Sequence, residues 1–219
     1  MTNWLQRIKT SFTNKSFLIS LMIGLAFLFL SFVVNFYAGT YATDKASNPV
    51  TDIILSNTRV YDLDSIFIYG PIVFWMFVSI LCFSQPKRLP FTLKSIALFV
   101  IIRSIFVSLT HIGPFPTQAI IDNTKIMKDF IFGGDLFFSG HTGLPFLMAL
   151  VFWESKYLKW IFVATAIFFG IVVLLAHLHY SIDVLSAFFI TYTIFHISSF
   201  LFKKDEVLFL SNNAPKTLN

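Results

Sequence analysis

The sequence is poor in charge. Only 12% of its 219 residues are charged, whereas a soluble globular domain carries about 25%. The hydrophobic share is 56% and the mean hydropathy is +0.77. This composition excludes an ordinary water-soluble domain and is typical of an integral membrane protein. At this length we expect one domain.

Cysteine is nearly absent as well. Cys82 is the single cysteine and lies within an apolar run. No disulfide can therefore form within the chain, and a cysteine-rich zinc site is excluded. The first apolar run is too long for a signal peptide and no small-residue cleavage site follows it, so we expect no cleaved leader.

The chain also lacks a basic stripe. Its net charge is +5, but the basic residues are divided among short loops and the two termini. We therefore expect no nucleic-acid partner. In a membrane protein, basic residues in such positions usually set the orientation of the helices.

Six long apolar segments are present, and each approaches the roughly 20 residues that a bilayer-spanning helix needs. Lipid offers no partner to an unpaired backbone group, and the alternating pattern of a barrel is missing, so the segments should be helices. The predicted fold is all-α, an integral membrane bundle of six transmembrane helices. The segments are Phe17–Tyr37, Ile66–Phe83, Phe91–Leu109, His141–Trp153, Leu158–His177 and Ser181–Phe202.

The basic residues of the short connections all fall on one side of this six-helix path, which we predict to be cytoplasmic. Both termini are then cytoplasmic, and the longer loops 38–65 and 110–140 lie on the other side. We expect a cytoplasmic segment over residues 1–16, the catalytic membrane domain over 17–204 and a polar tail over 205–219. The stretch Ile120–Phe132 is expected to form an interfacial helix. The basic residues are Arg7, Lys9, Lys15, Lys87, Arg88, Lys156, Lys159, Lys203 and Lys204.

Two short polar clusters interrupt the apolar chain on the non-cytoplasmic side. They run from Gly134 to Thr142 and from Ala176 to Val184. Each contains a histidine with neighbours that can orient it. Ionisable groups beside a membrane are costly and usually functional. Two histidines, one with a carboxylate four residues on, suit phosphoryl transfer through a covalent phosphohistidine.

His179 and Asp183 are four residues apart, which places them on one face of a helix. A carboxylate in this position can hold the far ring nitrogen of the histidine and leave the other nitrogen free to attack. The alternative is a histidine and an aspartate that only cap the start of a helix.

Ser139, Gly140 and His141 stand where the fourth predicted helix begins. The free N–H groups and positive dipole end of a helix bind phosphate readily. Gly140 permits close approach of the backbone, and Ser139 can either cap the helix or donate to a phosphoryl oxygen. The alternative is a plain serine cap with an incidental histidine.

Three further residues are candidates for substrate binding. Arg103 lies in an apolar run, where a guanidinium either meets an anion such as phosphate or extends to the interface. Asp135 could orient His141 or cap a turn, and His177 could line the pocket or be held by backbone groups of its loop. His111 and His196 are expected to be structural. We predict no metal site and no cofactor, since no second carboxylate–histidine pair faces the first.

These residues resemble the sphingomyelin synthase-like branch of the type 2 phosphatidic acid phosphatase superfamily, a group of lipid phosphatases and phosphotransferases. The cluster from Gly134 to Thr142 is similar to the motif C-G-D-x-x-x-S-G-H-T, and the one from His179 to Val184 to H-Y-S/T-x-D-V. Arg103 followed by Pro114-Phe115-Pro116 resembles an arginine-bearing helix that runs into a P-x-P turn. The stretch from Pro49 to Leu55 is similar to a P-L-P-D segment.

The resemblance implies a six-helix membrane enzyme with its site on the non-cytoplasmic face. His179 would be the nucleophile, Asp183 its orienting group and His141 the general acid and then base. Ser139, Gly140 and Arg103 would hold the phosphoryl oxygens. The substrate would be a phospholipid or lipid phosphate, and the acceptor a lipid alcohol or water.

The sequence departs from the motifs at three positions. Gly134 stands where the branch has a cysteine, Thr51 replaces the second proline of P-L-P-D, and Leu178 occupies a position that is acidic in animal sphingomyelin synthases. Because of these changes, the sequence does not identify the lipid donor or the acceptor, and it does not distinguish a phosphatase from a transferase. The oligomeric state is also open. Two alternatives are a non-enzymatic lipid-binding or scaffold protein with a degenerate site, and a transporter.

Overall fold

The computed structural model describes residues 2–119 and 136–211, and all of its regular elements there are helical. The predicted all-α fold is confirmed. The predicted interfacial helix Ile120–Phe132 lies outside the described residues. The helices are α1 (Thr2–Thr13), α2 (Lys15–Asp44), α3 (Asp64–Ser84), α4 (Leu89–Leu109), α6 (Gly140–Val151), α7 (Leu158–Leu175), α8 (Ser181–Leu201) and α9 (Lys203–Leu210), with short 3₁₀ turns η1 (Leu55–Asn57) and η2 (Pro86–Arg88).

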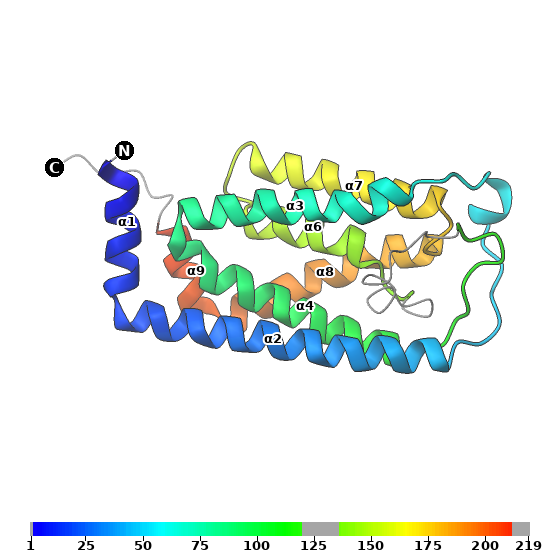
Figure 1. The fold of residues 1–219 in the computed structure, drawn as a ribbon, viewed down its shortest axis with the longest axis horizontal. Coiled ribbons are helices and arrows are strands. Elements are labelled where there is room, and N and C mark those ends of the chain that lie inside the picture. Colours follow the sequence, from blue (N-terminus) through cyan, green and yellow to red (C-terminus); the bar gives the residue numbers. More distant parts are fainter. Residues whose placement is uncertain (1, 120–135, 212–219) are drawn as a thin grey trace.

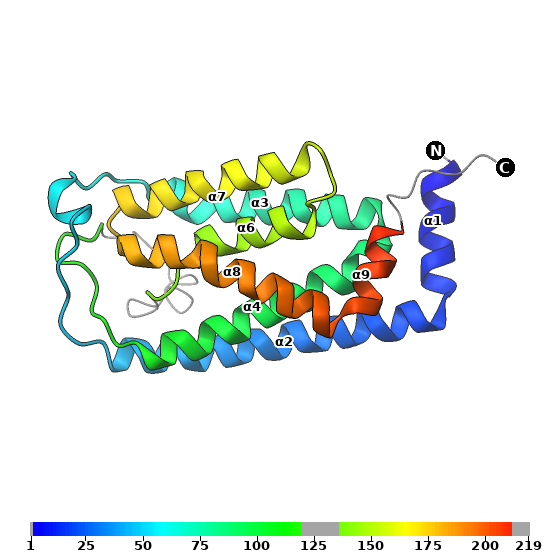
Figure 2. The same ribbon diagram turned by 180° about the vertical axis from the view of Figure 1, so that it is seen from behind.

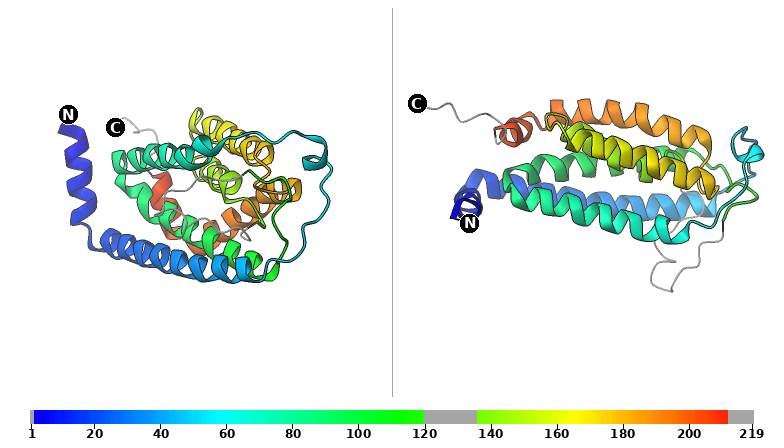
Figure 3. Two further views of the ribbon diagram at one scale, coloured as in Figure 1. Left: turned by 45° about the vertical axis from the view of Figure 1, so that its right-hand side comes forward. Right: turned by 90° about the horizontal axis from the view of Figure 1, so that it is seen from above.

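The long helices run roughly antiparallel along one direction (Figure 1). Helices α2 and α4 lie side by side, and α6 lies between α7 and α8, as the view from behind also shows (Figure 2). The loops before α3, after α4 and between α7 and α8 gather toward one end. The turn η2 and helices α1 and α9 lie at the other end, and α1 stands across the direction of the bundle (Figure 3).

Among the described residues, five helices are long and apolar enough to cross a membrane: α2, α3, α4 with its preceding turn, α7 and α8. The predicted span His141–Trp153 is instead the 12-residue helix α6. A helix of that length is about 18 Å long, whereas the hydrocarbon core is about 30 Å thick. Most of α6 is buried, so it lies inside the bundle and is enclosed by other helices, and a count of six full spans is not confirmed.

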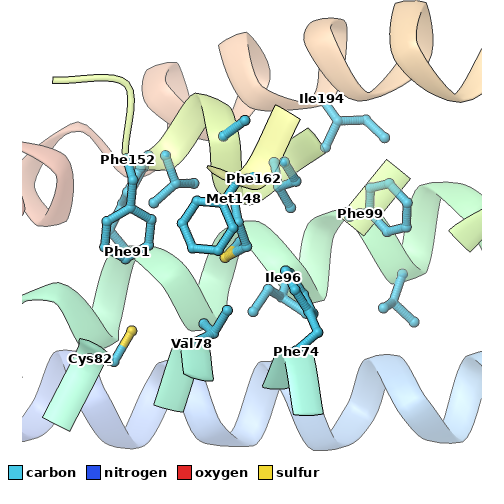
Figure 4. Close-up of a cluster of buried hydrophobic side chains, with 14 of the residues drawn as sticks. Phe74, Val78, Cys82, Phe91, Ile96, Phe99, Met148, Phe152, Phe162 and Ile194 are labelled. Carbon is cyan, nitrogen blue, oxygen red and sulfur yellow. The ribbon is translucent and has the colours of Figure 1, made fainter. Parts of the chain in front are cut away.

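The core of the bundle consists mainly of large aromatic and aliphatic side chains (Figure 4). Phe162 packs against Phe74 and Phe152, with ring centroids 5.9 Å and 5.5 Å apart. Gly143 allows α6 to enter this core, because a methyl group there would come within 2.7 Å of Phe99 and 2.9 Å of the Thr191 hydroxyl. The close approach of α6 to α4 and α8 therefore requires glycine at this position.

A buried ion pair joins three helices near the η2 end. Lys94 of α4 donates to Asp205 of α9 over 2.6 Å and to the hydroxyl of Ser20 of α2 over 2.7 Å. The same hydroxyl donates to the other carboxylate oxygen of Asp205. The start of the predicted tail 205–219 is therefore helical and anchored in the bundle, with Phe209 also buried.

We expect Asp205→Leu to destabilise the protein by about 3–5 kcal/mol, because it leaves the Lys94 ammonium buried without its charge partner. The double variant Lys94→Met with Asp205→Leu should recover most of the loss, since no unpaired charge remains. Thermal unfolding in detergent measures both effects. A double variant no more stable than Asp205→Leu alone would contradict this account.

The topology can be tested by labelling single cysteines on a Cys82→Ala background. Ser56 and Lys156 are both exposed and belong to opposite ends of the bundle. If the basic connections are cytoplasmic, an impermeant thiol reagent should label Ser56→Cys in intact cells and Lys156→Cys only after permeabilisation. The reverse pattern would place the candidate site on the cytoplasmic face.

Candidate active site

His179 lies two residues before the start of α8 and is mostly buried. Its Nδ1 is 2.8 Å from the backbone carbonyl oxygen of Leu136. A carbonyl oxygen can only accept, so this contact places the proton on Nδ1. In the neutral ring, Nε2 then carries the free lone pair and is the atom that can attack an electrophile.

Asp183 lies beside the same ring, as the four-residue spacing predicts. Its Oδ2 is 3.6 Å from Nδ1 of His179, and it accepts a 2.9 Å hydrogen bond from the backbone N–H of Tyr180. The residue is fully buried. One carboxylate therefore both caps the helix and places negative charge next to the imidazole, so the two interpretations of the sequence are compatible.

Ser139 connects the two polar clusters. Its backbone N–H donates to the carbonyl oxygen of Asp183 over 3.1 Å. Its hydroxyl accepts from the N–H of Thr142 over 3.4 Å and so caps α6. The turn that starts α6 is thus attached directly to the first turn of α8.

Arg103 approaches this turn from α4. Its Nε donates to the backbone carbonyl oxygen of Phe138 over 2.8 Å. A methyl group on Gly140 would lie 3.4 Å from the same Nε and 3.8 Å from Cζ. The side chain therefore turns into the bundle, against the start of α6, and does not extend along the lipid face.

His141 is in the first turn of α6 and lies against two other helices. Its ring stacks on Phe67 of α3 with centroids 4.2 Å apart, and Phe169 of α7 meets it edge-on at 6.1 Å. Nε2 lies 3.4 Å from the carbonyl oxygen of Phe67. At this distance the contact is a weak hydrogen bond.

His177 has a different environment. Its Nδ1 is 2.6 Å from the Thr117 hydroxyl and its Nε2 is 3.3 Å from that of Thr58. Its backbone has φ 55°, a left-handed conformation that is uncommon outside glycine. The ring thus braces two loops against the turn before His179. Its assignment to substrate binding remains a prediction.

Sequence reasoning missed three partners in the site. They are the Leu136 carbonyl, the Phe67 ring and Asp52, whose carboxylate accepts from the N–H and the hydroxyl of Ser181 at the start of α8. The likeness of the Pro49–Leu55 segment to a family motif drew attention to Asp52 without indicating its partner.

Asp135 lies outside the described residues, so its predicted contact with His141 stays a prediction. Within residues 2–119 and 136–211, no group of three or more His, Cys, Asp or Glu side chains is placed to hold a metal ion.

The fold and the site together describe a helical membrane protein with two histidines, a carboxylate and an arginine at the joined starts of α6 and α8. The family model of the PAP2 superfamily C-terminal domain matches residues 133–200, a range that holds both histidine motifs. This match supports an assignment to the type 2 phosphatidic acid phosphatase superfamily. It also supports a membrane protein of the lipid phosphatase or phosphotransferase type. No curated protein and no solved structure matches the chain.

His177 should make stability depend on pH. Burial lowers the pKa of His177 from its ordinary value of 6.5, although the negative charge of Asp52 partly opposes this. The folded protein therefore favours the neutral ring. Its contribution to the free energy of unfolding is fully present above about pH 6.5 and is lost as the pH falls below that value.

We expect the thermal midpoint in detergent to fall less steeply between about pH 7 and pH 5 in His177→Asn than in the wild type. Asparagine tolerates the left-handed backbone but does not titrate in this range. The control is His196→Asn, which removes an exposed histidine on α8. Equal slopes in the wild type and His177→Asn would contradict the prediction.

Proposed function

We propose that this protein is a sphingomyelin synthase-like enzyme that cleaves a phosphoester of a membrane lipid through a phosphohistidine and passes the phospho group to a lipid alcohol or to water. The observation that carries the proposal is the orientation of His179. Its Nδ1–H is held by the Leu136 carbonyl with Asp183 beside it, so Nε2 is left as the nucleophile. The site would lie on the non-cytoplasmic face.

In the first half-reaction, the lone pair of His179 Nε2 forms a bond to phosphorus. The bond between phosphorus and the leaving oxygen breaks, and that oxygen takes a proton from His141. General acid catalysis of this kind contributes about 10²–10⁴-fold. His141 follows Gly140 in the first turn of α6, so it is adjacent in the chain to the helix start that would face the phosphoryl group.

In the second half-reaction, His141 takes a proton from the acceptor alcohol or water. The acceptor oxygen forms a bond to phosphorus, and the phosphorus–nitrogen bond breaks, which returns the electron pair to Nε2 of His179. Water as acceptor makes the enzyme a lipid phosphatase or phospholipase. A lipid hydroxyl makes it a transferase.

The charge that develops on the phosphoryl oxygens needs stabilising donors. The Arg103 guanidinium lies against Gly140, which is the first residue of α6. The N–H groups of the first turn of α6 follow directly after this residue in the chain. Together they form a cationic and dipolar surface next to the histidines. A helix start with an arginine beside it favours a phosphate group. Asp135 and His177 are further candidates for substrate contacts.

The experiment is a rapid quench of purified enzyme with a short-chain phosphatidic acid labelled in its phosphate. Phosphohistidine predicts label on the protein that is lost in acid and stable in base, and that is absent from His179→Ala. His141→Ala should retain label for longer, because the second half-reaction lacks its base. Label on serine, or labelling that persists in His179→Ala, would contradict the assignment.

Asp183→Asn should slow turnover by less than the about 10⁴-fold seen when the orienting aspartate of a serine protease is removed. The reason is that the Leu136 carbonyl already fixes the His179 tautomer. Steady-state kinetics with the same lipid measure the loss. Wild-type activity in this variant would remove Asp183 from the mechanism. A correctly inserted wild-type protein that turns over no phospholipid or lipid phosphate would instead favour the non-enzymatic alternative.

A further inference from the structure

Asp52 lies in the loop between α2 and α3 and is far from the histidine motifs in sequence. Both of its carboxylate oxygens accept hydrogen bonds. Oδ2 accepts from the backbone N–H and from the hydroxyl of Ser181, each over 2.7 Å. Oδ1 accepts from the backbone N–H groups of Ile54 and Leu55 over 2.8 Å and 3.1 Å. The carboxylate thus receives four donors and ties its own loop to α8.

Asp52 is buried with 7% of its surface exposed. Burial alone would raise the pKa of its carboxyl group, but the hydrogen bonds from Ser181, Leu55 and Ile54 outweigh that effect and lower the pKa. The side chain is therefore ionised at neutral pH. A charged acceptor forms stronger hydrogen bonds than a neutral one, and negative charge at a helix N-terminus is favourable.

Ser181 is the first residue of α8, and His179 stands two residues before it. The residue between them, Tyr180, is fixed as well. Its hydroxyl donates to the carbonyl oxygen of Gly113 over 2.8 Å and accepts from the N–H of Val50 over 3.3 Å. The backbone on the C-terminal side of His179 is therefore attached to the same loop that carries Asp52.

We infer that Asp52 is a positioning residue for His179, whose carboxylate fixes the first turn of α8 and so holds the imidazole in register with the Leu136 carbonyl. The inference rests on the proposed function for its catalytic consequence, and the structural link can be tested separately. Asp52 touches neither phosphate nor imidazole in this scheme. It acts through Ser181.

Asparagine cannot replace the carboxylate. All four partners donate to Asp52, two to each oxygen. An amide has one accepting oxygen and one donating NH₂ group, so in either orientation at least one backbone N–H would face another donor. Ser181→Ala should have a smaller effect, because it removes the hydroxyl and keeps the backbone N–H bond.

The test compares Asp52→Asn with a matched control, Asp62→Asn. Asp62 is exposed in the same loop, and its carboxylate accepts a 3.3 Å bond from Asp64, at the start of α3 and not of α8. Both variants lose one negative charge. Hydrogen exchange measured by mass spectrometry in detergent reports on peptides that cover the first turn of α8. Single-turnover kinetics with labelled short-chain phosphatidic acid report on the step assigned to His179.

We expect faster exchange in the first turn of α8 in Asp52→Asn. With enzyme in excess over substrate, the single-turnover rate constant at saturation should be about 10- to 100-fold lower, with an unchanged half-saturating enzyme concentration. Asp62→Asn should match the wild type in both measurements. A purely structural defect would raise the half-saturating enzyme concentration, because fewer molecules are active, and would leave the rate constant at saturation unchanged. That result would overturn the positioning role.

Unchanged exchange in Asp52→Asn would overturn the link between Asp52 and α8 whatever the kinetics. If the wild type shows no turnover, the proposed function fails instead. Faster exchange in Asp52→Asn alone would then still support Asp52 as the group that holds the start of α8.

Discussion

The first N–H groups of a helix have no acceptors within the helix, and at the start of α8 two carboxylates supply acceptors. Asp183 accepts from Tyr180, and Asp52 accepts from Ser181. Because Asp52 belongs to the loop before α3, capping α8 also fixes that loop. The backbone carbonyl of Asp183 also accepts a hydrogen bond from the N–H of Ser139, and this bond attaches the start of α6 to α8. The arrangement of the candidate site depends on these hydrogen bonds at one helix terminus.

Much of this arrangement could be predicted because the membrane imposes simple rules. Long apolar runs must be helices, and the spacing of His179 and Asp183 places them on one face. Helix α6 differs from the predicted full span because its neighbours shield it, so that it need not match the thickness of the lipid. That shielding depends on Gly143 and its contacts with Phe99 and Thr191, and such tertiary contacts leave no periodic signal in a sequence.

The hydrogen-bond acceptor of His179 Nδ1 could not be predicted from the sequence. The spacing predicts that Asp183 holds this nitrogen, whereas the hydrogen bond goes to the Leu136 carbonyl, and Asp183 lies slightly farther away at 3.6 Å. A backbone carbonyl is present at every residue, so side-chain chemistry cannot indicate which one is used. Arg103 is a similar case, since it needs a partner in an apolar run and binds the Phe138 carbonyl.

A site for phosphate must also avoid repelling its substrate, and here two buried carboxylates lie near the proposed nucleophile. The Asp52 carboxylate accepts four hydrogen bonds, two from its own loop and two from Ser181 at the start of α8. These donors partly neutralise its negative charge. In Asp183, Oδ2 is occupied by Tyr180, whereas Oδ1 has no hydrogen-bond partner among the described residues. In the proposed mechanism the imidazole becomes positively charged when Nε2 binds phosphorus. The Nδ1 proton is then drawn from the neutral carbonyl toward the carboxylate, so Asp183 would stabilise the phosphohistidine more than the resting ring.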